Sequence, residues 1–146
     1  MKTLIAIGIL MIVVLSGCGS GVKFTKSVPP LPWNVVDLKV MEIEDIKSGG
    51  YAGTGTFVRN VFIHELRRSG PVIIDDNSTN HLIVRIEDYN PSDKYIALSA
   101  QIVDISQKQI IWNASISGVG NKTIDEVTQT VVMEMVKAMS EGEKMD

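Results

Sequence analysis

The chain has little of several residue types on which common functions depend. Its 146 residues include one cysteine and two histidines. A single thiol cannot form an internal disulfide, and neither histidine has a nearby partner with metal-ligand spacing. Lysine and arginine total 14 against 17 acidic residues, and the basic residues are spread thinly. The composition therefore excludes a disulfide framework and argues against a nucleic-acid partner, and we expect no cofactor.

A glycine-rich stretch, SGGYAGTGTF at residues 48–57, approaches a phosphate-binding loop without completing it. Gly50 and Gly55 have the spacing of that motif, whereas Thr56 stands where the motif needs a lysine. We therefore interpret the stretch as a loop that enters a helix, with Thr54 or Thr56 as the N-cap.

Two acidic motifs are also incomplete. HELRR begins with His64-Glu65 but lacks the second histidine that a zinc protease needs one turn later, so we expect both side chains at the solvated surface. Asp75-Asp76 resembles a pair of catalytic carboxylates, but at the end of a strand it indicates a turn. We assign no catalytic residue and no metal ligand, and we expect a protein that is not an enzyme.

The first 17 residues are typical of a signal peptide. Lys2 provides a positive start, and residues 4–15 form an uninterrupted apolar run that the small residues Ser16 and Gly17 follow. As a helix this run rises about 18 Å, less than the roughly 30 Å hydrocarbon core of a bilayer. The alternative is an uncleaved membrane anchor, since no charged residue stands between Thr3 and Val22.

LSGC at residues 15–18 resembles the bacterial lipobox, in which an aliphatic residue and two small residues precede an invariant cysteine. The resemblance implies that Cys18 becomes the mature N-terminus, with a diacylglycerol on its sulfur and a further acyl chain, such as palmitate, on its amine. Two or more chains anchor a protein stably, because each buried methylene contributes about 0.8 kcal/mol. The alternative is a buried structural cysteine, although the Gly-Ser-Gly run at residues 19–21 offers no core around it.

The residue after the cysteine bears on the choice of membrane. In the lipoproteins that this motif resembles, an aspartate at that position retains the protein at the inner membrane, whereas Gly19 stands here. The resemblance therefore implies the outer membrane, on its periplasmic side. A Gram-positive source would instead imply the outer face of the plasma membrane.

Residues 18–34 are predicted to be a lipidated tether between the membrane and the domain. The stretch begins with glycine and serine, lacks amphipathic periodicity and ends in Pro29, Pro30 and Pro32, which favour extended conformations. Trp33, at its end, is expected to pack on the edge of the domain. A proline-rich docking peptide for a partner is the less favoured alternative.

Residues 35–146 are predicted to form one folded domain. A helix is expected from Gly55 to Ser69 because an apolar stripe recurs at helical spacing, and a second helix follows the capping box at Thr123. Strands are expected at residues 35–45, 72–76, 81–90, 95–105 and 110–118, where apolar residues alternate with polar ones or form a short run. The apolar positions expected to face inward on these strands are Val36, Leu38, Val40, Leu82, Val84, Ile86, Ile96, Leu98, Ala100, Ile102, Ile110, Trp112, Ala114 and Ile116.

This element order, βαββββα, predicts an α+β fold. Short polar turns join the last three strands, so they are expected to form an antiparallel meander with one covered face. The expected architecture is a two-layer sandwich, with two helices on one face of a mostly antiparallel sheet of four to five strands.

Residues 35–140 resemble the small α/β domains of periplasmic accessory lipoproteins, on the segments HELRRSGPVIIDD, HLIVRIEDYN and DISQKQIIWNASISG. These lipoproteins include the curli-secretion and peptidoglycan-synthase-activator types, the amino-terminal domain of the Tol translocation protein, and lipopolysaccharide-assembly lipoproteins. In that group a hairpin often has Asp, two variable residues, Thr-Gly, and a Trp eight positions after the Asp. Asp104 and Trp112 keep this spacing, with Gln107-Lys108 in place of Thr-Gly.

The resemblance implies a non-enzymatic accessory or assembly factor that acts through protein contacts in the cell envelope. Arg85, Glu87 and Tyr95 lie on the polar side of the predicted strands and are the candidate partner-binding residues. The alternative is an auxiliary lipoprotein of a lipid or lipopolysaccharide transport system, which would need an exposed apolar cleft between the helices and the sheet.

Overall fold

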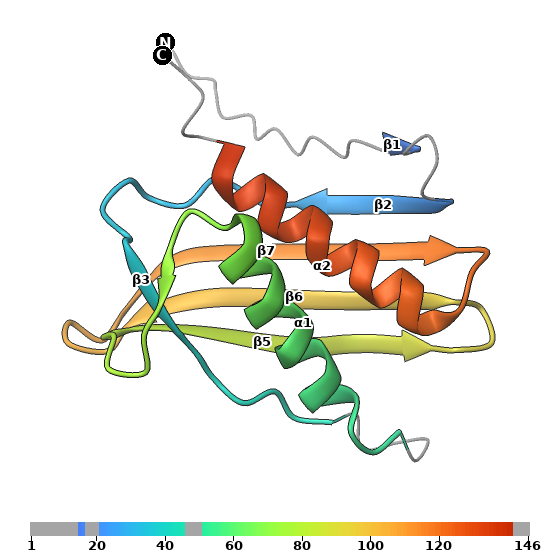
Figure 1. Cartoon of the computed structure of the whole chain (residues 1–146), viewed down its shortest axis with the longest axis horizontal. Helices are drawn as coiled ribbons and strands as arrows, with labels where there is room; N and C mark the ends of the chain where they lie inside the picture. Colours follow the sequence, from blue (N-terminus) through green and yellow to red (C-terminus); the bar gives the residue numbers. More distant parts are fainter. Residues whose placement is uncertain (1–14, 17–20, 46–50, 142–146) are drawn as a thin grey trace, which may run out of the picture.

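The computed structural model describes residues 15–16, 21–45 and 51–141. Two helices, α1 at Thr54–Ser69 and α2 at Ile124–Ser140, lie on the same face of one sheet (Figure 1). Neither is long and apolar enough to cross a membrane, and no other helix occurs in the described ranges. Most of the expected signal peptide, including the start of its apolar run, lies outside the described residues.

The sheet has the strand order β1-β2-β7-β6-β5-β3-β4. Strands β5, β6 and β7 form its centre as an antiparallel meander, as the sequence predicted. Strand β2 adds to β7 antiparallel, whereas β3 runs parallel to both β5 and β4. The strands span Leu15–Ser16 (β1), Val22–Ser27 (β2), Asp37–Val40 (β3), Ile73–Ile74 (β4), Asn80–Asn90 (β5), Tyr95–Asp104 (β6) and Gln109–Gly120 (β7).

The α+β class is confirmed, and both helices do cover one face of the sheet. The four- to five-stranded, mostly antiparallel sheet and the order βαββββα were wrong. One reason is that the crossover through α1 brings β3 and β4 into parallel pairs at one edge. The other is that β1 and β2 precede the first predicted strand and extend the opposite edge.

Strand β2 lies within residues 18–34, the stretch interpreted as a tether. All six of its residues pair with β7, from Val22 opposite Gly120 to Ser27 opposite Ser115. Val22 and Phe24 are buried while Lys23 and Thr25 are exposed. This alternation is the period of a half-buried strand and was readable in the sequence VKFT, although the prolines beyond it masked the signal.

The proline-containing segment after β2 is docked on the domain. The indole nitrogen of Trp112 donates a 2.9 Å hydrogen bond to the carbonyl of Pro29, and the amide of Leu31 donates to the carbonyl of Met139 at 3.0 Å. The expectation that Trp33 packs on the domain edge was wrong, because its side chain is 93% exposed. Trp112, from the sheet, makes the contact instead.

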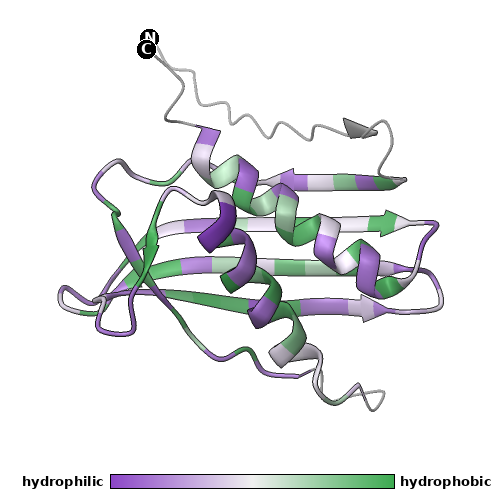
Figure 2. Cartoon of the chain, viewed as in Figure 1, coloured by the Kyte–Doolittle hydropathy of each residue, from purple (hydrophilic) through white to green (hydrophobic). Residues whose placement is uncertain are grey.

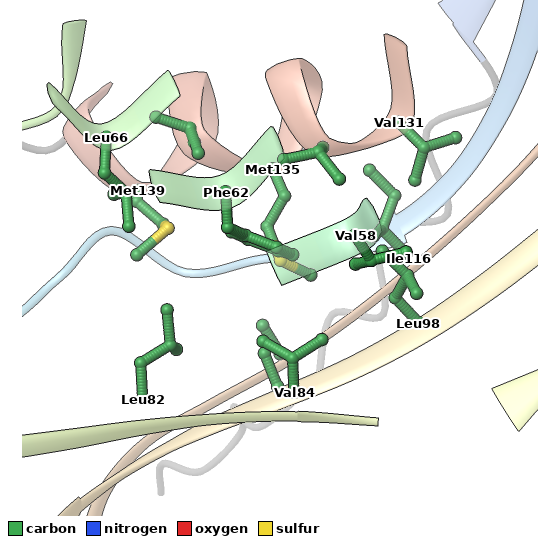
Figure 3. Packing of buried hydrophobic residues seen from close by; sticks show 14 of the residues in the cluster. Val58, Phe62, Leu66, Leu82, Val84, Leu98, Ile116, Val131, Met135 and Met139 are labelled. Carbon is green, nitrogen blue, oxygen red and sulfur yellow. The ribbon is translucent and has the colours of Figure 1, made fainter. Parts of the chain in front are cut away.

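The core fills the space between the helices and the sheet. Phe62 of α1 and Met135 of α2 are fully buried, and Figure 3 shows both side chains pointing toward the strands. The sheet contributes Leu82, Val84, Leu98 and Ile116 from three neighbouring strands. Figure 2 shows hydrophobic and hydrophilic residues in alternating bands along these elements, which is the pattern that burial of one side requires.

Most inward positions predicted on the strands are buried, but two were wrong. Ile110 is 59% exposed because a register shift between Ile102 and Val103 changes which residues of β7 point inward. Val36 is 61% exposed because β3 starts one residue later, and Val35 is buried before it.

Candidate protein-binding surface

The sheet face opposite the helices carries mostly small polar side chains. Leu98 and Ile116 point toward the helices and are buried, so the alternate residues of their strands lie on the other face. Hydroxyl and amide groups there offer hydrogen-bond donors and acceptors rather than an apolar patch. The outward positions include Lys23, Thr25 and Ser27 of β2, Asn113, Ser115 and Ser117 of β7, and Ser99 and Gln101 of β6.

The strand register arranges several of these side chains in rows. Arg85 of β5 lies opposite Ser99, Ser99 lies opposite Ser115, and Ser115 lies opposite Ser27. One row therefore crosses four strands with a guanidinium at one end and three hydroxyls behind it. We name this uncovered surface the polar face.

The structure brings together two of the three predicted partner-binding residues. Arg85 and Glu87 are both exposed on β5, and the hydroxyl of Ser99 donates a hydrogen bond to a Glu87 carboxylate oxygen. Tyr95 is half-buried at the start of β6, opposite Val119. It lies four residues before Ser99, about 13 Å along the strand. The role of all three in binding stays a prediction.

Two acidic residues singled out by the sequence have local structural roles. Asp75 accepts a hydrogen bond from the amide of Asn77 at 2.9 Å, which confirms the predicted turn. Asp104 accepts from both the hydroxyl and the amide of Ser106, and the hydroxyl is the larger cause of the lowered pKa of the Asp104 carboxyl. These carboxylates hold turns in place and do not converge on one site.

A third carboxylate, which the sequence reasoning missed, occupies the start of α1. The N-cap position is Gly53 and has no side-chain cap, so the prediction of Thr54 or Thr56 as N-cap was wrong. Asp45 instead accepts from the amides of Gly53 at 2.8 Å and Gly55 at 2.7 Å, and these bonds lower the pKa of its carboxyl. The chain's own anion thus takes the place that a phosphate would occupy at a helix N-terminus.

The HELRR motif has one exposed and one buried member. His64 is exposed, as predicted, but Glu65 is only 7% exposed, so the expectation that it lies at the surface was wrong. Glu65 follows Phe62 by three residues and shares its buried stripe, and Arg68 pairs with its carboxylate at 2.7 Å. Across the described ranges, histidine, cysteine and acidic residues form no group that could hold a metal ion.

An apolar hollow lies beside the docked proline segment. Its volume is about 480 Å³, and Leu31, Trp33, Val36 and Met139 are among its lining residues. It is not the cleft between helices and sheet that a lipid-handling protein was expected to have. The apolar and proline residues of PPLPW were a partial sequence signal for this hollow.

Cys18 lies outside the described residues. The first described residue after it is Gly21, which has a φ of 68°, a left-handed conformation that favours glycine. Strand β2 begins at the next residue. The proposed lipidation site is therefore separated from β2 by only three residues.

The fold is similar to those of solved bacterial proteins. The PelC dodecamer from Paraburkholderia phytofirmans gives a TM-score of 0.63 at 14% identity, over 82% of this chain and 97% of that chain. A variant of that PelC protein gives 0.64 at the same identity and coverage. A DUF330 protein from Xanthomonas campestris gives 0.54 at 12% identity, over 77% of this chain and 88% of that chain. No protein-family model and no curated protein matches the sequence. At 12–14% identity, the similarities to solved structures show the fold of the chain alone.

Proposed function

We propose that this chain is a lipid-anchored accessory factor of the bacterial cell envelope, on the periplasmic side of the outer membrane, that works through protein contacts without catalysis. The observation that carries the proposal is a lipobox-like cysteine, separated from β2 by three residues, in a chain whose fold is similar to nearly the whole of the solved PelC protein. The solved PelC protein is a dodecamer, so contacts between copies of this chain belong to the proposal.

The short spacing between Cys18 and β2 gives the proposal a geometry. Four residues of extended chain reach at most about 14 Å, so an anchor on Cys18 would hold the start of β2 close to the bilayer surface. Cleavage before Cys18 would also remove Leu15–Ser16, the strand β1 that pairs with Lys23 and Phe24. In the mature protein β2 would then be the edge of the sheet.

Support for a non-enzymatic role comes from what the acidic side chains do. Asp45 and Asp104 accept hydrogen bonds from neighbouring groups of the chain, and Glu65 pairs with Arg68. Each has a structural partner that accounts for its position. The polar face, by contrast, offers exposed charges and hydroxyls suited to recognition.

Capture of partners from detergent-solubilised envelopes tests the proposal. We expect the tagged full-length chain to enrich a specific envelope protein, or further copies of itself. The charge-swap variant Arg85→Glu/Glu87→Lys should enrich less of it than the matched control Lys137→Glu/Glu141→Lys, whose exposed residues lie near the end of the sequence. Capture of no specific partner would overturn the proposal. Equal capture by both variants would show that the polar face does not bind the partner.

The second candidate is an auxiliary lipoprotein of a lipid or lipopolysaccharide transport system. The apolar hollow at Trp33 favours it, because the exposed side chains there include Trp33 and Val36. Lipid extraction of the purified protein, followed by mass spectrometry, tests this candidate. A stoichiometric lipid beyond the anchor that Trp33→Ala removes would support it, and none would count against it.

A further inference from the structure

Both outer edges of the central meander are covered only in part. Strand β2 pairs with the second half of β7, from Ser115 to Gly120, and β3 pairs with the first part of β5. The β3 pairs end at Lys39 opposite His81 and Val40 opposite Leu82, followed by one hydrogen bond from the amide of Met41 to the carbonyl of Leu82. Beyond that point no strand of the described ranges pairs with the outer edge of β5.

The direction of the exposed backbone groups follows from that last bond. The carbonyl of Leu82 points toward β3, and backbone groups of a strand alternate sides, so the amides and carbonyls of Val84 and Ile86 point the same way. The register shift between Ile86 and Asp88 ends this regular stretch. Val84 and Ile86 thus present two donors and two acceptors at an edge where a further strand could add.

The chain that leaves β3 is held away from β5 by contacts with α1. The Arg59 guanidinium donates to the carbonyl of Val40 at 2.9 Å, Ile43 is 7% exposed, and Asp45 binds the amides at the start of α1. These contacts fix residues 41–45 on the helix side. A groove of about 490 Å³ is left between them and residues 83–87 of β5.

The groove has an acidic rim. Glu42 and Glu44 are exposed on either side of the buried Ile43, which places both carboxylates on one side of an extended segment, roughly 7 Å apart. Alternate residues of a bound strand repeat at the same distance. Glu87 adds a carboxylate, and Arg85, whose side chain belongs to the polar face, is the basic residue of the lining.

From this geometry we propose that the edge of β5 at residues 83–86 binds an extended, basic peptide segment of a partner protein as an added strand. The backbone groups of Val84 and Ile86 would pair with the peptide backbone, and Glu42 and Glu44 would pair with alternate lysine or arginine side chains. This inference rests on the proposed function and names the chemistry of one partner. The groove shares Arg85 and Glu87 with the polar face, whereas Glu42, Glu44 and the backbone edge of β5 belong to the groove alone.

The test uses the full chain, purified in detergent, and a blocked synthetic hexapeptide of alternating lysine and valine. We expect the peptide to slow amide hydrogen exchange within residues 83–87 at least tenfold at saturation. The variant Glu42→Gln/Glu44→Gln should weaken binding at least threefold at low salt, whereas the control Asp76→Asn/Glu141→Gln, which also neutralises two exposed acids, should bind as wild type does.

Two further peptides test the acidic rim and the backbone pairing with the unaltered protein. A glutamate-valine hexapeptide, and a lysine-valine peptide methylated on alternate backbone nitrogens, should both fail to bind. Binding of the methylated peptide, or slowed amide hydrogen exchange on β6 and β7 in place of β5, would contradict strand addition at the edge of β5. If the groove fails while envelope capture succeeds, the proposed function stands; if the peptide binds but no envelope partner is captured, the proposed function falls alone.

Discussion

Replacing Phe24 by alanine tests whether the first residues of the predicted tether belong to the folded domain. Phe24 is 5% exposed in β2 and lies in the core cluster together with Val22. Truncating a buried phenylalanine removes about 3–5 kcal/mol of unfolding free energy. Because β2 lies near the sheet edge and can relax, we expect about 3 kcal/mol. For a domain of this size that is a loss of roughly 10–12 °C in Tm.

The matched control is Thr25→Ala on the same strand. Thr25 is exposed on the polar face, so its truncation should change the unfolding free energy by no more than about 0.5 kcal/mol. Urea denaturation of the full chain in detergent, followed by tryptophan fluorescence, measures both variants. If Phe24→Ala unfolds at the same urea concentration as Thr25→Ala, β2 contributes nothing to the core and the account of the sheet is wrong.

Three other predictions concern single contacts. Asp45→Asn should destabilise the protein at neutral pH, because the pKa of the Asp45 carboxyl is lowered in the folded state. The ionised carboxylate therefore stabilises the fold fully above the ordinary carboxyl pKa of roughly 3.9. This stabilisation is lost as the pH falls through the lower folded-state pKa. Denaturation at pH 7 and pH 2.5 should show a smaller difference for the variant than for wild type, and an equal difference would contradict this. Gly118→Ala should lower the free energy of unfolding by about 1–3 kcal/mol, because the added methyl group would overlap a Val131 methyl group on α2. An unchanged Tm would refute this prediction. Trp112→Phe removes the hydrogen bond to Pro29 and should cost about 1 kcal/mol, while limited proteolysis after residue 28 becomes faster; unchanged cleavage would show that this bond does not hold the segment.

The sequence predicted the centre of the fold because its signals there are local. Ile96, Leu98, Ala100 and Ile102 alternate without interruption, and all four are buried. The capping box is also present, with the Thr123 hydroxyl accepting from the Glu126 amide and the Glu126 carboxylate accepting from the Thr123 amide. Such patterns depend only on neighbouring residues, so they can be read before the fold is known.

The errors lie where distant contacts decide the structure. Strand β2 is short, and its pairing with β7 is set by residues about 90 positions later in the chain. The carboxylate at the start of α1 comes from Asp45, across a glycine-rich loop, and not from the adjacent threonines. Glu65 was expected at the surface because it is charged. Its position on the buried side of α1 and its partner Arg68, three residues later, account for its burial.

The candidate site was predicted only in part. Arg85 and Glu87 lie together on the polar face because alternation on β5 places them there, which the sequence pattern indicated. The unpaired edge of β5 was not foreseeable in the same way. It arises because Arg59 binds the end of β3 and directs the following chain toward α1. A strand edge becomes visible only when the pairing of every neighbouring strand is known.

The mass of the N-terminal peptide, measured on protein isolated from membranes of its host, shows whether Cys18 carries the lipid anchor. We expect the mature chain to begin at Cys18, and we expect this residue to carry a diacylglycerol and an additional acyl group. An N-terminal peptide that retains Met1, or a Cys18 without lipid, would contradict the anchor, the location and the proposed role together.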